Sequence, residues 1–529
     1  MIGIAVFFAF LMGAAPAQAQ DVQESMIKFG RLLRLIDSYY VDSTNVDKLT
    51  DEAIVDLLSK LDPHSVYISK EEVEKMNEPL VGSFEGIGIS FNILRDTLMV
   101  VTTIPGGPSE KVGLMPGDRI MVVDGKPIAG VGLQNSDVMD MLRGDKGTRV
   151  DLQVQRNREV SLLDFTIIRD KIPLYSLDAS YMLNDHTGYI KINRFAATTT
   201  DEFDTAIADL KKNPGLENLV LDLRGNGGGY LKKAIELADQ FLGPDKLVVY
   251  TEGNNDRRKD YESSAVGEFE HGRLVVLIDE GSASASEIVS GAIQDWDRGL
   301  IIGRRSFGKG LVQQPFPLTD GSVVRLTTAH YYTPSGRCIQ KPYDKGVEEY
   351  REDYLHRFES GELFSADSIH LDKSQVYSTL VNKREVYGGG GIMPDVFVPL
   401  DTTSNYAFYN QVIRRNILNT AILTYLDSNR ETIKNKYPDF ASYDNKFSIG
   451  DEFVENVIAQ AAEEKVDSDK ESIDFARPLI KKLGKALIAR DVFGTNYYFQ
   501  VINKDEEIIK KAVEVLENNS NYEKILAEK

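Results

Sequence analysis

The sequence predicts an α+β fold of several domains, with a mixed α/β core between helical ends. At 529 residues, and with about 150 residues per domain, the chain is long enough for three or four domains. Its residues are 42% hydrophobic and 27% charged, an ordinary globular composition that excludes wholesale disorder and a multi-span membrane protein. Along the chain the apolar pattern changes from helical spacing to short β-branched runs and back again.

The first 19 residues have the pattern of a secretory signal peptide. An uncharged apolar run over 2–15 is followed by small residues and an A-x-A site, Ala17-Gln18-Ala19. We expect cleavage after Ala19 and an exported, periplasmic protein. The alternative is an uncleaved leader that keeps the protein at the membrane, although the run is shorter than the about 18 residues of a span. The single cysteine, Cys338, excludes an intrachain disulfide.

Residues 20–81 are predicted to form a small helical segment. Their apolar residues recur at helical spacing until the turn Asp62-Pro63-His64-Ser65 interrupts them. From 82 to 160, short β-branched runs alternate with proline and glycine turns, which predicts a compact domain that is mostly β.

Residues 161–400 predict an α/β core, because apolar strands at 219–223 and 274–278 alternate with amphipathic helices. Beyond this core, residues 401–529 are nearly all helical in pattern, with charges on the outer faces.

The charge balance excludes one class of partner. The chain has 61 Lys and Arg against 81 Asp and Glu, a net charge of −20, and such a surface repels phosphate backbones. We therefore expect no nucleic acid partner. The six histidines are scattered without a metal-binding spacing, so we expect neither a metal site nor a cofactor.

Three serines stand where a buried strand ends and a helix begins, in the segment 282–287. Within it, Ser284 and Glu287 match the capping box S-x-x-E, in which the serine only satisfies helix N–H groups. A helix N-terminus also offers free N–H groups and a positive dipole end, which suit a developing oxyanion. Taken alone, the segment favours the capping interpretation.

A second segment places Lys309 between Gly308 and Gly310. From Gly303 it nearly matches a phosphate-binding loop, but the hydroxyl after the lysine is absent and prolines follow where a helix is required. Nucleotide binding is therefore excluded. What is left is a lysine whose flanking glycines leave its side chain room to enter a site, or an ordinary turn.

Together the two segments predict a Ser/Lys dyad. Lys309 can deprotonate Ser284 once burial lowers its pKa from near 10.4 to about 7, at a differential cost of about 4 kcal/mol. No histidine pairs recognisably with Ser284. A glycine-rich stretch at 225–229 follows another strand and offers further backbone N–H groups to an oxyanion.

Over about residues 23–400 the chain resembles the C-terminal processing peptidases, or tail-specific proteases. The resemblance rests on these motifs: Leu61 to Ser65, Gly86 to Ile89, Asp222 to Gly229, Ser282 to Glu287, Phe307 to Gly310 with Gln313, Tyr332 to Arg337, and Gly391 to Asp395. It implies a serine endopeptidase with a ClpP/crotonase-like α/β core and an inserted PDZ domain. In that family the nucleophile falls on Ser284, the base on Lys309 and the lysine-orienting residue on Gln313. The oxyanion donors fall on the N–H groups of Ala285 and Gly228.

The resemblance also makes 82–160 a PDZ domain that captures protein or peptide substrates by their apolar C-termini. The loop of Gly86, Ile87, Gly88 and Ile89 would bind the terminal carboxylate, and the peptide would add as a strand. Met141 is expected in the apolar pocket with the two isoleucines. Arg143 is expected either to bridge the PDZ domain to the protease body or to be solvated.

Two regions depart from the family pattern: a charged insertion at about 339–387 and the helical region 401–529. Each is expected to cover the site, bind an adaptor protein or support a homo-oligomer. The rival from another class is a catalytically inactive, PDZ-bearing periplasmic scaffold, in which Ser284 is only a cap. A hydratase-like enzyme is a further alternative, but no acyl-carrier pocket is legible in the sequence.

Overall fold

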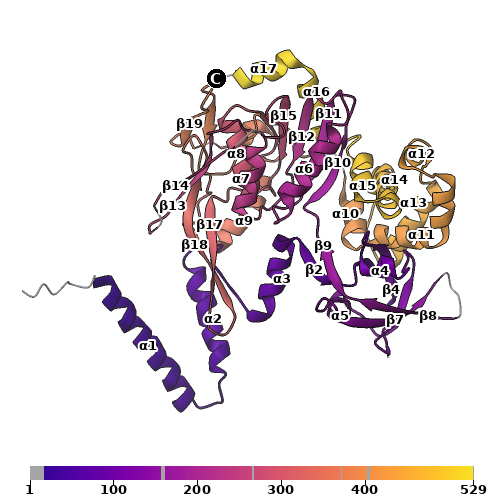
Figure 1. Ribbon diagram of the computed structural model, residues 1–529, viewed down its shortest axis with the longest axis horizontal. Coiled ribbons are helices and arrows are strands. Elements are labelled where there is room, and N and C mark those ends of the chain that lie inside the picture. The colour runs from indigo at the N-terminus through magenta and orange to yellow at the C-terminus, as the bar shows by residue number, and fades with distance from the viewer. Residues whose placement is uncertain are drawn as a thin grey trace, which may run out of the picture.

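The computed structural model describes residues 17–156, 161–255, 257–264, 267–370, 372–401 and 405–527. Most of the expected signal peptide, residues 1–16, lies outside this part, and the first described helix begins at Ala17. Within the described ranges, no helix is long and apolar enough to cross a membrane. The chain runs from a projecting helical arm through a β-rich domain and an α/β core to a helical C-terminal region (Figure 1).

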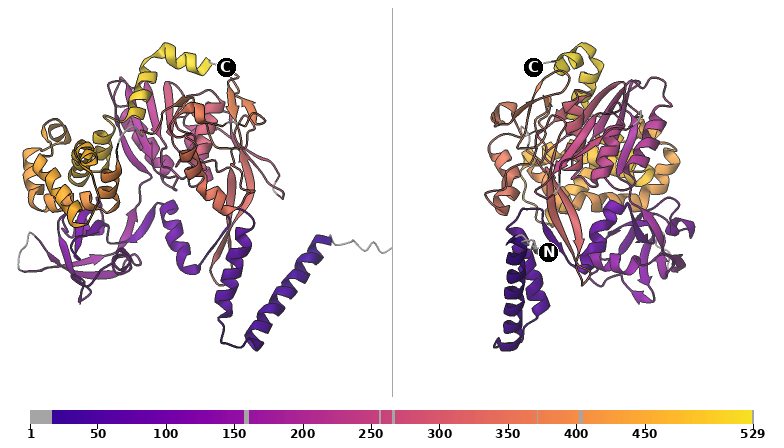
Figure 2. Two further views of the ribbon diagram at one scale, coloured as in Figure 1. Left: turned by 180° about the vertical axis from the view of Figure 1, so that it is seen from behind. Right: turned by 60° about the vertical axis from the view of Figure 1, so that its left-hand side comes forward.

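The N-terminal segment begins with two helices that project from the rest of the molecule, α1 and α2 (Figures 1 and 2). It comprises α1 (Ala17–Tyr39), α2 (Val46–Ser59), β1 (Val66–Ile68) and α3 (Lys70–Val81). The side chain of Asn45 caps α2 by accepting from the N–H of Lys48 at 3.0 Å. After α2 the chain turns at 62–65 into β1, which pairs antiparallel with strand β18 (Val323–Tyr332) of the core.

The β-rich domain is a small sheet with one helix and one short helical turn against it. Its elements are β2 (Ser83–Gly86), β3 (Ile89–Ile93), β4 (Leu98–Thr103), α4 (Pro108–Lys111), β5 (Arg119–Val123), β6 (Lys126–Pro127), α5 (Asn135–Leu142), β7 (Arg149–Gln155), β8 (Leu163–Ile168) and β9 (Asp170–Pro173). The sheet has the order β3-β4-β5-β7-β8, which makes β3 an edge strand. Strands β2 and β9 pair with each other, so one short ribbon joins both ends of the domain to the rest of the chain.

The α/β core is built on a second sheet of order β10-β11-β12-β15-β16-β21. Its strands are β10 (Leu177–Met182), β11 (Thr187–Ile192), β12 (Asn218–Asp222), β15 (Arg273–Ile278), β16 (Leu300–Gly303) and β21 (Val396–Phe397). All pairs except β10–β11 are parallel. The helices on one face are α6 (Thr199–Leu210), α7 (Leu231–Asp239) and α8 (Ala285–Asp295). This agrees with the buried, near-continuous apolar strands in the sequence.

The other face of this sheet is covered by the end of the chain. Helix α16 (Glu507–Glu517) packs Ile508, Ala512 and Leu516 against Val220 and Val275, and α17 (Asn519–Ala527) adds Tyr522 to the same cluster. The helical pattern of 401–529 predicts a region apart from the α/β core. In the structure, however, its last two helices form part of that core.

A further sheet carries the long hairpin of β17 (Leu311–Pro317) and β18, together with β1, β13 (Leu247–Glu252) and β14 (Lys259–Glu262). The charged insertion that the sequence predicts at 339–387 forms α9 (Val347–Glu359), the 3-10 turn η1 (Ala366–Ser368), β19 (Val376–Ser378) and β20 (Glu385–Tyr387).

The remaining C-terminal helices form a bundle with its own apolar core. They are α10 (Ala407–Arg414), α11 (Ile417–Lys436), α12 (Phe440–Lys446), α13 (Asp451–Glu463), α14 (Lys470–Phe493) and α15 (Thr495–Ile502). The bundle contacts the β-rich domain through Leu423 against Met99 and Val101, and through an Arg119–Asp427 ion pair at 2.7 Å. It therefore links the β-rich domain to the core.

Candidate active site

Ser284 lies between the end of β15 and the first residue of α8, and its side chain is partly exposed. Its backbone has φ +55° and ψ −109°, a region that residues with a Cβ atom rarely occupy. Strained residues of this kind are concentrated at functional sites, where surrounding contacts hold them. The strain therefore adds an observation that the capping interpretation does not explain.

Backbone N–H groups surround this serine. Ala285 is the first residue of α8, whose positive dipole end suits negative charge. Gly228 has φ +100°, and a Cβ on it would lie 2.9 Å from the Cβ of Ser284 and 3.0 Å from the nitrogen of Ala285. The structure thus brings both expected oxyanion donors to Ser284. In this conformation, however, the Gly228 N–H donates to Oδ1 of Asn226 at 2.9 Å, so an oxyanion would share or replace that acceptor.

Lys309 lies in the loop between β16 and β17. Its Nζ donates to Oε1 of Gln313 at 3.1 Å, as the family resemblance implies. Burial lowers the lysine pKa below its ordinary value, and the positive charge of Arg325 lowers it further. The flanking glycines have a different role from the one expected, because a Cβ on Gly310 would meet the backbone nitrogen of Gln340 at 2.9 Å. They allow neighbouring backbone to approach rather than leaving open space around the lysine.

Two buried side chains join the serine and lysine segments. The carboxylate of Glu287 accepts from the N–H groups of Ser284 and Lys309 at 2.7 and 2.9 Å, and from the Ser306 hydroxyl and the Gly308 N–H. The Tyr331 hydroxyl lies 3.1 Å from the carbonyl oxygen of Ser284 and 2.5 Å from that of Lys309. Among the described residues, no hydrogen bond joins the Ser284 hydroxyl directly to Lys309 Nζ. Catalytic hydrogen bonds of this kind often form only when substrate is bound.

The sequence missed part of this arrangement. The capping pattern identifies Glu287 as a partner of Ser284, but nothing in it indicates the bonds to the lysine loop. Tyr331 lies within an ordinary strand pattern and has no distinguishing signal. The turn at 62–65 is recognisable in the sequence. Nothing in the sequence indicates that the carbonyl oxygen of His64 in this turn accepts a hydrogen bond from Gln313.

The expected peptide-binding loop connects β2 to the edge strand β3. Ile87 is only 2% exposed and packs in the domain core, so its side chain does not line an open pocket, whereas Ile89 and Met141 are partly buried. Gly88 has φ +76°, which favours glycine. Gly86 forms an isolated bridge with Arg143.

Arg143 does not reach the core sheet. Its guanidinium pairs with Glu78 of α3 at 2.6 Å and lies over the ring of Phe84 at 4.8 Å from the ring centre. It therefore joins the β-rich domain to the helix that precedes it.

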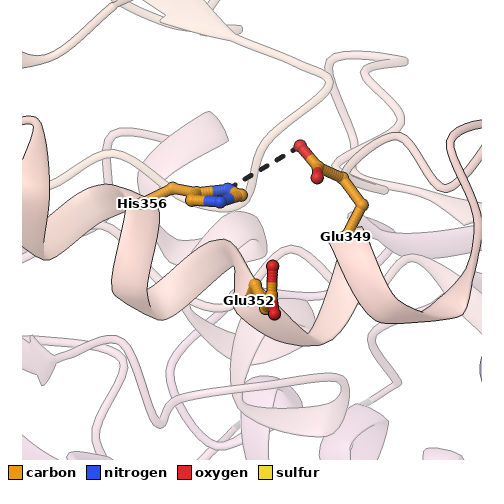
Figure 3. A group of neighbouring side chains, drawn as sticks. All are labelled: Glu349, Glu352 and His356. Carbon is orange, nitrogen blue, oxygen red and sulfur yellow. Dashed lines mark ion pairs between the residues drawn. The ribbon is translucent and has the colours of Figure 1, made fainter.

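One group of possible metal ligands exists among the described residues. Glu349, Glu352 and His356 lie along an exposed face of α9, with their ligand atoms within 4.8 Å of one another (Figure 3). His356 Nδ1 and Glu349 Oε1 form an ion pair at 3.8 Å. Exposed acidic groups of this kind are common without a metal, and nothing further points to one, so we interpret them as a solvated helix face.

Three segments match family models. Residues 186–349 match Peptidase family S41, residues 86–167 match the PDZ domain, and residues 408–494 match a Family of unknown function (DUF8443). The chain is 34% identical over 386 residues to a carboxy-terminal-processing protease of Bartonella bacilliformis, covering 72% of this chain and 86% of the relative. It is 37% identical over 341 residues to the carboxy-terminal processing protease CtpB of Bacillus subtilis, covering 63% and 70%. A solved photosystem II D1 C-terminal processing protease is 29% identical, with a TM-score of 0.35, covering 59% of this chain and 90% of that one.

Proposed function

Because the chain belongs to the carboxy-terminal processing proteases of peptidase family S41 and contains a PDZ domain, we propose that it cleaves exported proteins whose C-termini the PDZ domain binds. In this proposal Ser284 is the nucleophile, Lys309 the general base and Gln313 the residue that orients the lysine. The observation that carries it is the strained serine whose backbone is tied to the lysine segment by Glu287 and Tyr331.

The reaction starts with neutral Lys309. Its Nζ takes the proton of the Ser284 hydroxyl while Oγ attacks the scissile carbonyl carbon. The N–H of Ala285, at the helix N-terminus, donates to the oxyanion, and Gly228 is placed to supply a second donor. As the tetrahedral intermediate collapses, the C–N bond breaks and Lys309 returns the proton to the leaving amine. Lys309 then takes a proton from water, which attacks the acyl-enzyme, and as the C–O bond to Ser284 breaks Lys309 returns that proton to Oγ and is neutral again.

The surroundings of Lys309 support this role. Burial and Arg325 lower its pKa, while Glu287 and Asp62 act in the opposite direction. Burial raises the pKa of Glu287, and four hydrogen bonds favour its charged form. Glu287 thus serves the reaction by holding backbone, and no proton needs to pass through it.

Capture of the substrate is assigned to the PDZ domain. Strand β3 is an edge strand, which suits addition of a peptide as a further strand. Because Ile87 is in the domain core, the loop of Gly86 to Ile89 contributes main-chain N–H groups, and the partly buried side chains of Ile89 and Met141 favour apolar tails. We further propose that residues 1–19 direct export to the periplasm.

The test measures peptide release by mass spectrometry from an unfolded protein with an apolar tail. We expect Ser284→Ala and Lys309→Ala each to abolish cleavage while thermal unfolding shows an intact fold. Amidation of the substrate's C-terminus should raise KM. Full activity in either variant would exclude the dyad and leave the scaffold interpretation of Ser284, whereas indifference to amidation would exclude tail recognition.

A further inference from the structure

The amide of Gln313 is held at both ends. Its Oε1 accepts from Lys309 Nζ at 3.1 Å, and its Nε2 donates to the backbone carbonyl of His64 at 2.5 Å. A carbonyl oxygen can only accept, so the His64 carbonyl selects the NH2 end of the amide. The oxygen end is thereby turned towards Lys309.

This orientation matters for a lysine that acts as a base. A neutral amine has two N–H bonds and one lone pair. With Oε1 facing it, Lys309 donates one N–H to Gln313 and keeps its lone pair for the proton of Ser284. With the amide reversed, Nε2 would donate to that lone pair and occupy the base.

The carbonyl of His64 belongs to a turn that is firmly built. Oδ1 of Asp62 accepts from the N–H groups of His64 and Ser65 at 2.7 and 2.9 Å, and Oδ2 accepts from the Ser65 hydroxyl at 2.5 Å. Thr327 of β18 then donates its hydroxyl to Asp62 and its N–H to the Ser65 hydroxyl oxygen, both at 3.1 Å. Thr327 is also the cross-strand partner of Gln313 in the β17–β18 hairpin. The turn is therefore anchored opposite the side chain that it orients.

The imidazole on the same turn is held by the insertion. Nε2 of His64 lies 2.8 Å from the hydroxyl of Tyr350 on α9, and the two rings meet edge to face at 5.2 Å. Tyr350 is only 4% exposed. Burial and the charge of Lys309 lower the pKa of His64 to about 4, so the imidazole is neutral near pH 7 and adds no positive charge to that of Arg325 near the lysine.

We propose that the Asp62–Ser65 turn, held by Thr327 and Tyr350, is a positioning element for the reaction. It fixes the amide of Gln313 so that Lys309 keeps its lone pair for Ser284. The inference rests on the proposed dyad, and it gives roles to a turn motif and an insertion that the dyad alone leaves unexplained.

The test uses uncharged changes, so that the charge near Lys309 stays constant. Ser65→Ala removes the hydroxyl that links the turn to Thr327, and the nearly isosteric Thr327→Val removes the bond to Asp62. We expect kcat to fall about tenfold or more in each, with KM within about twofold. In the full chain labelled with ¹³C at lysine Cε, NMR titration should show a lower pKa for Lys309, because the ammonium loses its acceptor. Tyr350→Phe should change both quantities in the same direction and by less.

The matched control is Ser322→Ala. Ser322 is also buried and donates its hydroxyl to an aspartate, Asp320, but it lies at the far end of the hairpin. We expect its kcat and its lysine titration to match the unchanged protein. A loss as large as that of Ser65→Ala would mean that any disturbance of the hairpin is sufficient, and it would overturn the proposal.

The deciding comparison repeats Ser65→Ala in a Gln313→Ala background. If the turn acts through Gln313, the pKa of Lys309 should be the same in the double variant and in Gln313→Ala. An undiminished further shift would overturn the positioning role. The titration does not require an active enzyme, so it separates the two proposals. Activity retained by Lys309→Ala would contradict the dyad. Additive shifts of the Lys309 pKa in the double variant would contradict only the positioning role of the turn. If Ser65→Ala does not fold, Thr327→Val is compared in the same way.

Discussion

The backbone N–H groups of Ser284 and Lys309 donate to the same atom, Oε2 of Glu287. Glu287 is fully buried in the first turn of α8, and its other oxygen accepts from Ser306 and Gly308. One carboxylate therefore fixes the spacing between the segment of the nucleophile and the segment of the base. Because both bonds are made to backbone, the link holds the loops while both side chains stay available for chemistry.

Glu287→Gln should reduce both stability and activity. An amide has one oxygen in place of two, so some of the four donors would face an NH2 group and lose their acceptor. We expect the free energy of unfolding to fall by about 1–3 kcal/mol and kcat to fall with it. Thermal unfolding and peptide hydrolysis measure the two effects. Glu359→Gln, on the exposed end of α9, is the control, and normal kcat in Glu287→Gln would contradict the linking role.

The rate should rise with pH as Lys309 loses its proton. Since burial and Arg325 lower the lysine pKa, the midpoint of the rise in kcat/KM should lie below the ordinary value of 10.5. Arg325→Gln removes a neighbouring positive charge, so the lysine pKa should increase and the midpoint should move to higher pH. The measurement is the pH profile of kcat/KM. Arg258→Gln, an exposed residue just before β14, should leave the profile in place, and an unmoved midpoint in Arg325→Gln would refute the assignment.

Two inactive variants of Ser284 should differ in stability. Alanine retains the Cβ and hence the strain of φ +55°, whereas glycine occupies such a conformation readily. We expect Ser284→Gly to be more stable than Ser284→Ala by about 1 kcal/mol. Paired denaturant or thermal unfolding curves measure the difference. Equal stabilities would show that this backbone is relaxed rather than held under strain.

Leu423→Ala should loosen the PDZ domain from the C-terminal bundle. Leu423 is 2% exposed and packs on Met99 and Val101, so its truncation should cost about 2–5 kcal/mol locally. Hydrogen exchange in β4 and α11 should increase. Cleavage of a substrate captured by its tail should slow more than that of a short peptide lacking one. Leu355→Ala, on an exposed face of α9, is the control, and unchanged exchange would contradict the proposed link.

The sequence alone indicates both the family and the architecture. The helical ends, the β-rich domain and the alternating core follow from hydrophobic periodicity, which records which face each element buries. Motif order then placed a peptidase core and a PDZ domain, as the family models confirm. The sequence predicts Ile87 in the peptide pocket, but the structure places its side chain in the domain core. Hydrophobic periodicity does not distinguish a pocket residue from a core residue.

From the site, the sequence therefore shows three local features and their order along the chain: a turn at 62–65, a serine before a helix and a lysine between glycines. The family resemblance predicts that the serine and lysine segments meet, whereas the place of the turn beside them and the contacts that hold all three come from the folded structure. The contacts responsible are Glu287 to Lys309 and His64 to Gln313, and the latter two residues are 249 positions apart. Such contacts arise when separate strands and loops pack together. The order of apolar and turn-forming residues along the sequence indicates burial and turns. It does not indicate which donor and which acceptor from distant segments form a hydrogen bond.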